Sequence, residues 1–262
     1  MTIRIKPPLC YSCIGMRDHQ EDCIYPLEGK ATAQSRFFIL CDGMGGHHHG
    51  EVASALVCET LSNFFTSHPL TDGVLSEALF KQGLSEAYDT LDKNDDGSYK
   101  KMGTTLVFIY LHNEGCFTAH IGDSRIYHVR SGKGIMHQSV DHSLVNDLLK
   151  IGEITPKEAL NHPQKNIITR AMQPNLGQRC KAEIHQLTDI QAGDYLFLCS
   201  DGVLEQLTNE KLVAVLSDSS LSDVEKIKAL EDISLHKTRD NFSAYLIPVD
   251  QIESENSFLI LS

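Results

Sequence analysis

Four aspartates lie at the boundaries of predicted β-strands, where their carboxylates could bind a metal ion. Three follow short apolar runs that are typical of buried strands, and the fourth comes just before the last such run. They are Asp42, Asp123, Asp201 and Asp240. In an antiparallel sheet the start of one strand lies level with the end of its neighbour, so all four carboxylates could meet at one edge. Carboxylates this close stay ionised together only when cations lie between them.

The ligand atoms of such a cluster determine its chemistry. Oxygen ligands alone suit hard ions such as Mg2+ or Mn2+. Two of these ions about 3.5–4 Å apart can activate water for in-line attack on phosphorus. Arg17 is a candidate for holding the phosphate, because a guanidinium group can bind two phosphate oxygens at once. The alternative is that the acids are ordinary turn residues, since Asp-Gly pairs are frequent in turns.

Composition and charge exclude several classes of protein. The chain has 262 residues, of which 41% are apolar and 22% charged, as is ordinary for a soluble globular protein. The formal net charge of −12 argues against nucleic acid as the main partner, since phosphate backbones bind basic surfaces. No apolar run approaches the roughly 18 residues of a membrane span, and no segment typical of a secretory signal follows the N-terminus. We therefore expect a cytoplasmic protein with no membrane partner.

Two short motifs resemble metal sites but lack essential ligands. Cys10 and Cys13 form one C-x-x-C pair among eight cysteines, without a second pair or histidines at ligand spacing. We expect these cysteines to be reduced structural thiols. The segment 92–97 matches the first half of an EF-hand loop, but Gly103 stands where the bidentate glutamate belongs. We expect a solvated loop there.

The remaining pattern predicts strands interleaved with helices. Residues 1–40 are strand-rich, and the segment 251–262 is either an added strand or frayed. Gly152 marks the end of one short helix, and Thr155, Pro156 and Glu158 mark the start of another, so residues 141–170 should form a flap. The other expected strands are 104–110, 116–121, 125–130, 195–199 and 242–249. The other expected helices are 51–65, 74–91, 209–216 and 223–234.

The order of these motifs resembles the type 2C family of metal-dependent protein Ser/Thr phosphatases, the PPM family, and most closely its bacterial branch. The resemblance runs from about residue 11 to residue 249. One such motif alone is weak, whereas the whole set in the family's order is specific. The motifs are Arg17-x-x-Gln20-Glu21-Asp22, Asp42-Gly43-Met44-Gly45-Gly46-His47, Gly50-Glu51, Gly103-Thr104-Thr105, Gly122-Asp123-Ser124-Arg125, Asp141-His142-Ser143-Leu144-Val145, His162-Pro163, Ile168-Thr169-Arg170-Ala171, Ser200-Asp201-Gly202 and Asp240-Asn241.

The resemblance implies an α+β fold. This is a four-layer α-β-β-α sandwich, in which helices flank two antiparallel sheets and the metal site lies at one edge of the sandwich. Residues 1–250 would form a single phosphatase domain with a flap at about 141–170, followed by a C-terminal tail at 251–262. The implied enzyme is a protein-serine/threonine phosphatase, a phosphoric monoester hydrolase. Its mechanism would be direct attack by a metal-bound hydroxide, without a phosphoenzyme.

The resemblance also implies which residues hold the two ions, Mn2+ or Mg2+, of the core site. Asp42 would bridge them, and the main-chain carbonyl of Gly43 would bind one. Asp201 and Asp240 would complete the other.

Four further residues receive roles in the same way. Asp123 would hold a third, weaker ion, while Asp22 and Glu21 would hold metal-bound waters. Arg17 would bind the substrate phosphate. The residues implied as catalytic are Asp42, Asp201 and Arg17.

Two positions depart from the family pattern. Gln20 stands where Asn or Met is common, although Arg17 and Asp22 on either side are intact. Met44 stands where animal relatives carry a histidine that is proposed as the general acid, and methionine cannot donate a proton. The donor is therefore either a metal-bound water or another residue. The histidines 47–49 lie nearby and titrate in a suitable range.

We expect phosphorylated proteins as substrates, a Ser/Thr kinase as the opposing enzyme, and a monomer. Two alternatives keep the same fold: a non-catalytic module that binds phosphoproteins, and a phosphoesterase for small molecules. The complete set of metal-binding acids argues against the first alternative. The second stays open, because the shape of the flap and groove selects the substrate.

Overall fold

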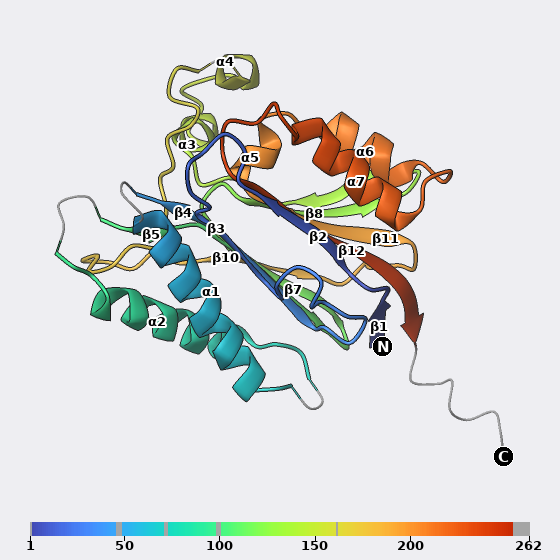
Figure 1. Cartoon of the computed structure of the whole chain (residues 1–262), viewed down its shortest axis with the longest axis horizontal. Coiled ribbons are helices and arrows are strands. Elements are labelled where there is room, and N and C mark those ends of the chain that lie inside the picture. Colours follow the sequence, from blue (N-terminus) through green and yellow to red (C-terminus); the bar gives the residue numbers. More distant parts are fainter. Residues whose placement is uncertain (1, 46–48, 71–72, 98–100, 161, 254–262) are drawn as a thin grey trace.

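Two antiparallel sheets stack face to face, and helices cover both outer faces of the stack (Figure 1). This computed structural model describes residues 2–45, 49–70, 73–97, 101–160 and 162–253. Its four layers are those of the α+β sandwich expected from the sequence.

In the part of the chain that the structure describes, each sheet has six strands and every pairing is antiparallel. The order in the first sheet is β1-β12-β11-β8-β9, with β2 paired to β12, and the order in the second is β10-β7-β6-β4-β3, with β5 paired to β4. The first sheet contains β1 (Thr2–Ile5), β2 (Leu9–Cys13), β8 (Arg125–Arg130), β9 (Gly134–Gln138), β11 (Asp194–Cys199) and β12 (Phe242–Glu253). The second contains β3 (Asp22–Tyr25), β4 (Phe37–Met44), β5 (Gly103–Thr104), β6 (Leu106–His112), β7 (Gly115–Ile121) and β10 (Glu183–Leu187).

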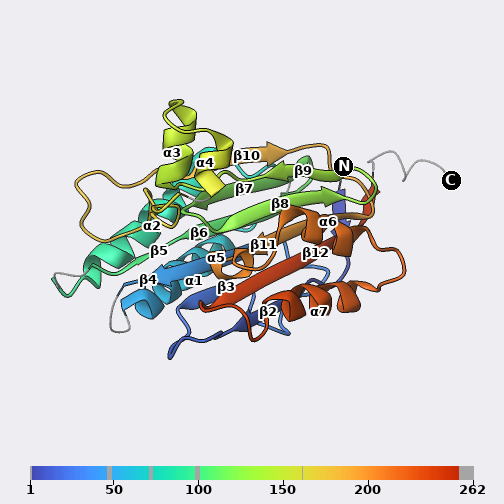
Figure 2. The same cartoon turned by 90° about the horizontal axis from the view of Figure 1, so that it is seen from above.

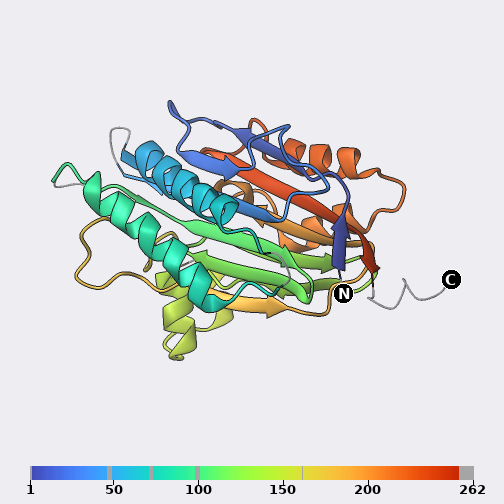
Figure 3. The ribbon, with the colours of Figure 1, turned by 90° about the horizontal axis from the view of Figure 1, so that it is seen from below.

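Two long helices, α1 (His49–Ser67) and α2 (Glu77–Lys93), lie side by side over the second sheet (Figure 3). The first sheet is covered by α6 (Asn209–Ser217) and α7 (Asp223–Ser234), while the short α5 (Asp201–Leu204) follows directly after β11. The flap consists of α3 (Leu144–Lys150) and α4 (Pro156–Leu160). It lies at the opposite end of the molecule from the start of β1 (Figure 2).

The period-two alternation of the strands produces three separate layers of core. On β6, Val107, Ile109 and Leu111 face the first sheet, whereas Phe108 and Tyr110 pack beneath α1 and α2. Strand β11 divides its residues in the same way between the intersheet core and the layer under α6 and α7. Because both faces of these central strands are buried, they appear in the sequence as continuous apolar runs.

The C-x-x-C pair on β2 is divided by the same alternation. Cys10 packs into the core between the sheets, and Cys13 packs into the layer under α7. All eight cysteines are free thiols. Two side chains on opposite faces of a strand cannot bind one metal ion or form one disulfide together.

The flap has the local signals that the sequence predicted. Gly152 has a φ of +78° at the end of α3, a conformation that glycine adopts without strain. Before α4, the Glu158 carboxylate accepts the Thr155 N–H at 2.7 Å, and the Glu158 N–H donates to the Thr155 hydroxyl. This reciprocal pair is the predicted capping box.

Several boundaries differ from the expected ones. Strand β4 continues through Asp42 to Met44, because Gly43 and Met44 pair with β5. The expected strand 104–110 is divided into β5 and β6. Strands β9 and β10 were not predicted; each is an edge strand of its sheet with few apolar residues. Strand β12 runs on to Glu253 by pairing with β1, and residues 254–262 lie outside the described residues.

Candidate metal centre

Asp22 and Asp42 form a directly opposed pair on the neighbouring strands β3 and β4. The next pair, Cys23 and Cys41, packs toward α1, so the two aspartates face the first sheet. The Ser200 hydroxyl at the end of β11 donates to Asp22 Oδ2 at 2.8 Å. The pair therefore lies at the edge of the sandwich where both sheets meet.

The backbone of Asp42 is fixed by two threonines. The Asp42 N–H donates to Thr105 Oγ1 at 3.0 Å, and the Thr105 N–H and the Thr104 hydroxyl both donate to the Asp42 carbonyl. Thr105 Oγ1 also bonds Ser124 Oγ at 2.8 Å, next to Asp123. With its main chain held in this way, the Asp42 carboxylate has a defined position at the site.

Asp201 and Asp240 reach the same edge from the first sheet. Asp201 begins α5 after β11, and Asp240 lies two residues before β12, the antiparallel neighbour of β11. The two segments touch so closely that a Cβ on Gly202 would lie 2.0 Å from the Asn241 carbonyl oxygen. The carboxylates of Asp201 and Asp42 lie within hydrogen-bonding distance of each other, so they can share a proton. The predicted convergence of strand-end acids is therefore present in the structure.

Burial, and then the charges of neighbouring carboxylates, raise the pKa values of Asp22, Asp42, Asp123 and Asp201. Burial, together with the charges of Asp22, Asp201 and Asp123, raises the pKa of Asp42 well above its usual range. Burial raises the pKa values of Asp22 and Asp123 to about 7 each, with a contribution from Asp201 in both cases. The pKa of Asp201 is also raised, by burial and then by Asp240.

This cluster fits the divalent ions that the sequence predicted. Within the described residues, two buried carboxylate oxygens, Asp22 Oδ1 and Asp123 Oδ1, have no hydrogen-bond partner. A buried anionic oxygen without a partner is costly unless a cation meets it. All the groups offered are oxygens, which suits Mn2+ or Mg2+.

Gly43 and Glu21 lie where α1 begins. The Gly43 N–H donates to the Glu21 carbonyl at 3.0 Å, and a Cβ on Gly43 would lie 2.2 Å from the Gly50 carbonyl oxygen. This close approach of α1 is a reason for glycine at position 43 that sequence reasoning missed. The Glu21 side chain is half-buried beside Gly50, and burial raises its pKa.

Arg17 lies on an exposed loop and contacts the site directly. Its Nη2 donates to Asp240 Oδ2 at 2.6 Å. Asn241 holds the loop, because its Nδ2 donates to the carbonyls of Ile14 and His19 while its Oδ1 accepts the Glu21 N–H. Sequence reasoning placed Asn241 in a motif without a role, and an amide directly after a site acid was the signal available.

The proton donor proposed from the sequence falls largely outside the described residues. Met44 ends β4, and His49 is the first residue of α1. Residues 46–48 are not described.

A second group of ligand-type side chains lies near the flap. One nitrogen each of His120 and His142 and an oxygen of Glu183 are all within 4.8 Å of one another. The two imidazole rings are stacked, with 4.6 Å between their centroids and 6° between their planes, so their in-plane lone pairs cannot converge on one ion. His142 Nδ1 also accepts the Gly122 N–H, so this nitrogen already has a partner within the protein. We interpret this group as a hydrogen-bonded cluster.

His137 on β9 and His185 on β10 lie close by, with 4.8 Å between their ring centroids. Burial and the neighbouring histidines 185, 128 and 120 lower the pKa of His137 to about 4, below the value of about 6.5 in an unfolded chain. Between these values the unfolded chain binds more protons. The contribution of His137 to the free energy of unfolding is therefore fully present above pH 6.5, and it is lost as the pH falls toward 4.

We expect the melting temperature of His137→Gln to fall less than that of the wild-type protein between pH 7 and pH 5. The comparison uses thermal melts of both proteins in the same buffers, so that the titration of other groups cancels. Equal slopes would contradict the assignment of this pH dependence to His137.

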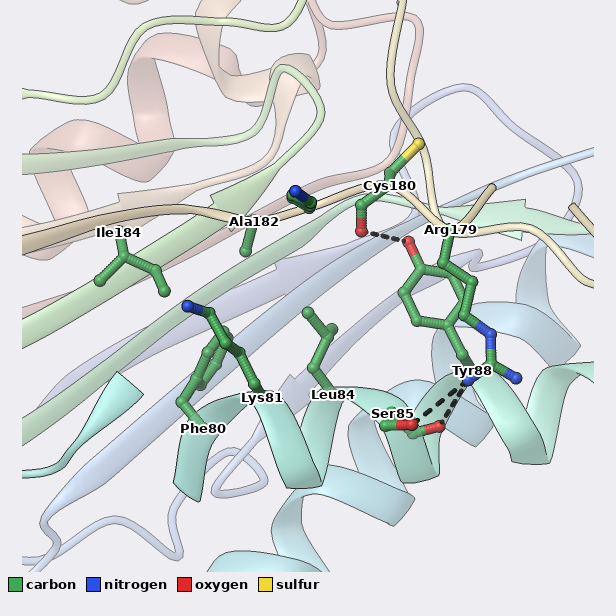
Figure 4. A pocket seen from close by; sticks show the side chains of 10 residues that line it. Phe80, Lys81, Leu84, Ser85, Tyr88, Arg179, Cys180, Ala182 and Ile184 are labelled. Carbon is green, nitrogen blue, oxygen red and sulfur yellow. Dashed lines mark hydrogen bonds between the residues drawn. The ribbon is translucent and has the colours of Figure 1, made fainter. Parts of the chain in front are cut away.

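A cavity of about 410 Å3 lies apart from these acids, between α2 and the segment before β10 (Figure 4). Phe80, Leu84 and Tyr88 form its apolar wall, and none of the described residues that line it is acidic. Two of its lining cations are paired with acids, since Arg179 binds Asp89 and Asp92 at 2.6 Å and Lys81 binds Glu77 at 2.7 Å. The cavity is therefore not the metal centre.

The loop that resembles half of an EF-hand is held by ion pairs and amide contacts. Asp95 accepts the Lys101 ammonium at 2.5 Å and the Asn175 amide at 2.6 Å, and Asp92 accepts Arg179. These contacts explain the positions of Asp92 and Asp95 without a calcium ion.

A sandwich with clustered acids from both sheets at one edge is the arrangement expected of a metal-dependent hydrolase of phosphate esters. Residues 12–234 match the family model described as Protein phosphatase 2C. The chain belongs to the protein phosphatase 2C family. In the described residues no helix is both long and apolar enough to cross a membrane.

Similar proteins agree with this membership. The chain is 37% identical over 188 residues to protein phosphatase PhpP of Streptococcus pneumoniae, a match that covers 71% of this chain and 74% of that protein. The structure resembles that of the serine/threonine phosphatase Stp1 from Staphylococcus aureus, with a TM-score of 0.81, 29% identity and coverage of 95% and 98%. It also resembles the catalytic domain of the serine/threonine protein phosphatase PstP in complex with two manganese ions, with a TM-score of 0.74, 27% identity and coverage of 95% and 100%.

Proposed function

We propose that this protein phosphatase removes phosphate from phosphoserine and phosphothreonine in proteins by direct attack of water on phosphorus. The reaction would take place at a centre for two Mn2+ or Mg2+ ions, with a third held more weakly. The observation that supports this is the meeting of Asp42, Asp201 and Asp240 beside two buried carboxylate oxygens that have no hydrogen-bond partner. When bound, the ions would lower the pKa of a water and neutralise the charge of the phosphate.

The residues of the core site take their proposed roles from their positions. Asp42, at the middle of the cluster, would bridge two ions, with the Gly43 carbonyl beside it on one of them. Asp201 and Asp240 from the first sheet would hold the other. Asp22, which is opposite Asp42 and bonded to Ser200, would orient a water molecule, and Glu21 would do the same at the start of α1.

Asp123 and Arg17 complete the site at its two sides. Asp123 follows β7, and its partnerless Oδ1 makes it the candidate ligand of the third ion. The Arg17 guanidinium lies beside Asp240, where it could bind two oxygens of the phosphate and hold phosphorus in line with the attacking water.

The central test is the hydrolysis of defined substrates by the purified protein. With Mn2+ present, we expect turnover of an aryl phosphate and of a phosphothreonine peptide. Chelation should abolish both reactions. Failure to hydrolyse either substrate with Mn2+ would support a non-catalytic binding module, and a strong preference for small esters would support a small-molecule phosphoesterase.

Arg17→Ala should lower kcat/KM for a phosphothreonine peptide by about a hundredfold, because a charge-assisted bidentate contact with phosphate is lost. Arg17→Lys keeps the charge but loses the bidentate contact, so its kcat/KM should lie between those of the wild-type protein and Arg17→Ala. The inhibition constant of inorganic phosphate should rise in parallel.

Arg4→Ala is the control, since Arg4 lies on β1 at the far end of the molecule. An Arg17→Ala enzyme with unchanged phosphate inhibition would contradict the proposed role.

We also propose that the protein acts in the cytoplasm as a monomer with a single phosphatase domain. The domain expected at 1–250 extends to Glu253, where β12 ends, which leaves 254–262 for the C-terminal tail expected at 251–262. The opposing enzyme would be a Ser/Thr kinase, because each phosphate removed must first be transferred to the substrate. Cell fractionation and gel filtration test the first two statements. Deletion of residues 254–262 with full retention of activity would agree with the third.

A further inference from the structure

His142 stands between the turn that carries Asp123 and the root of the flap. The main-chain N–H of His142 donates to the Gly122 carbonyl at 2.9 Å. The Gly122 N–H donates in return to Nδ1 of the His142 side chain at 3.1 Å. Its own carbonyl accepts the N–H of Thr169, where the flap returns, at 2.8 Å. One residue thus binds both backbone groups of the glycine before Asp123 and the far end of the flap.

A second contact joins the same two segments. Arg125, two residues after Asp123, donates from Nε and Nη2 to the two carboxylate oxygens of Asp141 at 2.6 and 2.7 Å. The roots of the flap are also paired with each other through the bridge between Ser143 and Ile168. A shift of the flap root must therefore move the 122–125 turn or break these bonds.

Gly122 has little freedom to absorb such a shift. Its φ is +106°, and a Cβ at this position would lie 2.6 Å from Thr105 Cγ2. Thr105 is the residue that fixes the backbone of Asp42. The 122–125 turn is therefore packed between the core of the metal centre and His142.

The imidazole of His142 is held at both of its nitrogens. Nδ1 accepts the Gly122 N–H, while Nε2 lies 3.6 Å from a carboxylate oxygen of Glu183 and 3.3 Å from Arg170 Nη1. The ring stacks on His120, which is fixed by a 2.9 Å contact between its Nε2 and the Val140 carbonyl. Burial, His120 and Arg170 lower the pKa of His142 to about 4, in keeping with a neutral ring at pH 7.

We propose that His142 is a positioning residue: it sets the Asp123 carboxylate for the weaker ion and couples occupancy of that position to the flap. This inference rests on the proposed function, since it takes Asp123 as a metal ligand. It goes beyond that function because the sequence assigns His142 no role. Residues that orient a metal ligand without touching the metal typically change affinity by 10–100-fold when replaced.

The test compares three substitutions of His142 with a control. His142→Asn keeps an acceptor near the position of Nδ1, His142→Gln moves that acceptor by one methylene, and His142→Leu removes it. His137→Leu is the matched control, because His137 belongs to the same group of histidines but makes no described contact with Gly122 or the flap. Circular dichroism and thermal melts establish that each variant is folded.

Two readouts are needed besides activity. The first is titration with Mn2+ by calorimetry, which separates tight ions from a weaker one. We expect tight binding to persist in every variant, and affinity at the weaker site to fall at least about tenfold in His142→Leu and His142→Gln. His142→Asn and His137→Leu should bind as the wild-type protein does.

The second readout is trypsin cleavage in the flap, which contains Lys150, Lys157 and Lys165. In the wild-type protein and in His142→Asn, Mn2+ at the concentration that fills the weaker site should slow cleavage. In His142→Leu this protection should be lost. If the leucine variant does not fold, the comparison of His142→Asn with His142→Gln tests whether the acceptor at the position of Nδ1 sets the affinity for the weaker ion.

The outcomes separate this inference from the proposed function. Unchanged binding of the weaker ion in His142→Leu, or equal weakening in the asparagine and glutamine variants, would overturn the positioning role while the enzyme remains active. An active wild-type protein that binds two ions and no third would do the same. A wild-type protein that neither binds Mn2+ nor hydrolyses phosphate esters would instead overturn the proposed function.

Discussion

Asp42→Asn is expected to lower phosphatase activity by at least about a thousandfold and to raise the melting temperature of the metal-free protein. The activity falls because the carboxylate proposed to bridge the ions is lost, and a thousandfold corresponds to about 4 kcal/mol of transition-state stabilisation. The stability rises because burial and the charges of Asp22, Asp201 and Asp123 oppose ionisation of Asp42. Asparagine keeps the shape and removes the charge.

Initial rates with an aryl phosphate and thermal melts in chelator measure the two effects. Asp232→Asn on the outer face of α7 is the control, since it removes an equal charge at an exposed i,i+4 pair with Lys228. The control should leave activity unchanged. An active Asp42→Asn enzyme would contradict the proposed centre, and a less stable metal-free variant would contradict the view that repulsion dominates there.

Binding of Mn2+ should stabilise the chelated protein strongly. A ligand that binds only the folded state at a thousand times its Kd adds about 4 kcal/mol. For a chain somewhat longer than 200 residues, this corresponds to a rise of about 8–16 °C in the melting temperature for one ion. The raised pKa values of Asp22 and Asp123, about 7 each, mark carboxylates whose charge a cation would relieve.

Thermal melts across a Mn2+ titration measure this effect. The same titration of Asp42→Asn should show a much smaller shift, because its core site has lost the bridging ligand. A wild-type melting temperature that does not depend on Mn2+ would exclude a metal centre built from these acids.

Local patterns predicted most of the strands and a possible meeting of the acids, whereas the four-layer sandwich was implied by the resemblance to the phosphatase family. Buried central strands appear as apolar runs, and an acid at the end of such a run is either a turn residue or a ligand for a cation. The same reasoning set the end of the strand before Asp42, whereas β4 continues to Met44. Its last two residues pair with Gly103 and Thr104, about sixty positions away, and no local signal reports that pairing.

The edge strands, and the side chains that hold the site's loops in place, were harder to predict from the sequence. Strand β10 has the sequence Glu-Ile-His-Gln-Leu, which becomes a strand only because β7 offers a partner. Asn241 and His142 act through main-chain contacts with loops that are remote in the sequence. Such roles depend on how the loops come together in three dimensions, which residue type and spacing do not specify.

Neither sheet contains the whole centre. Asp22 and Asp42 belong to the second sheet, Asp201 and Asp240 flank strands of the first, and the distance between the two sets is set by the apolar layer in which Phe38 meets Tyr245. The thickness of that layer therefore determines how far apart the two sets of carboxylates lie. A smaller or larger side chain in this layer would change the distance between the two sets of proposed ligands without changing any of the ligands themselves. We therefore expect the selectivity of the proposed centre between Mg2+ and the larger Mn2+ to depend partly on the hydrophobic core.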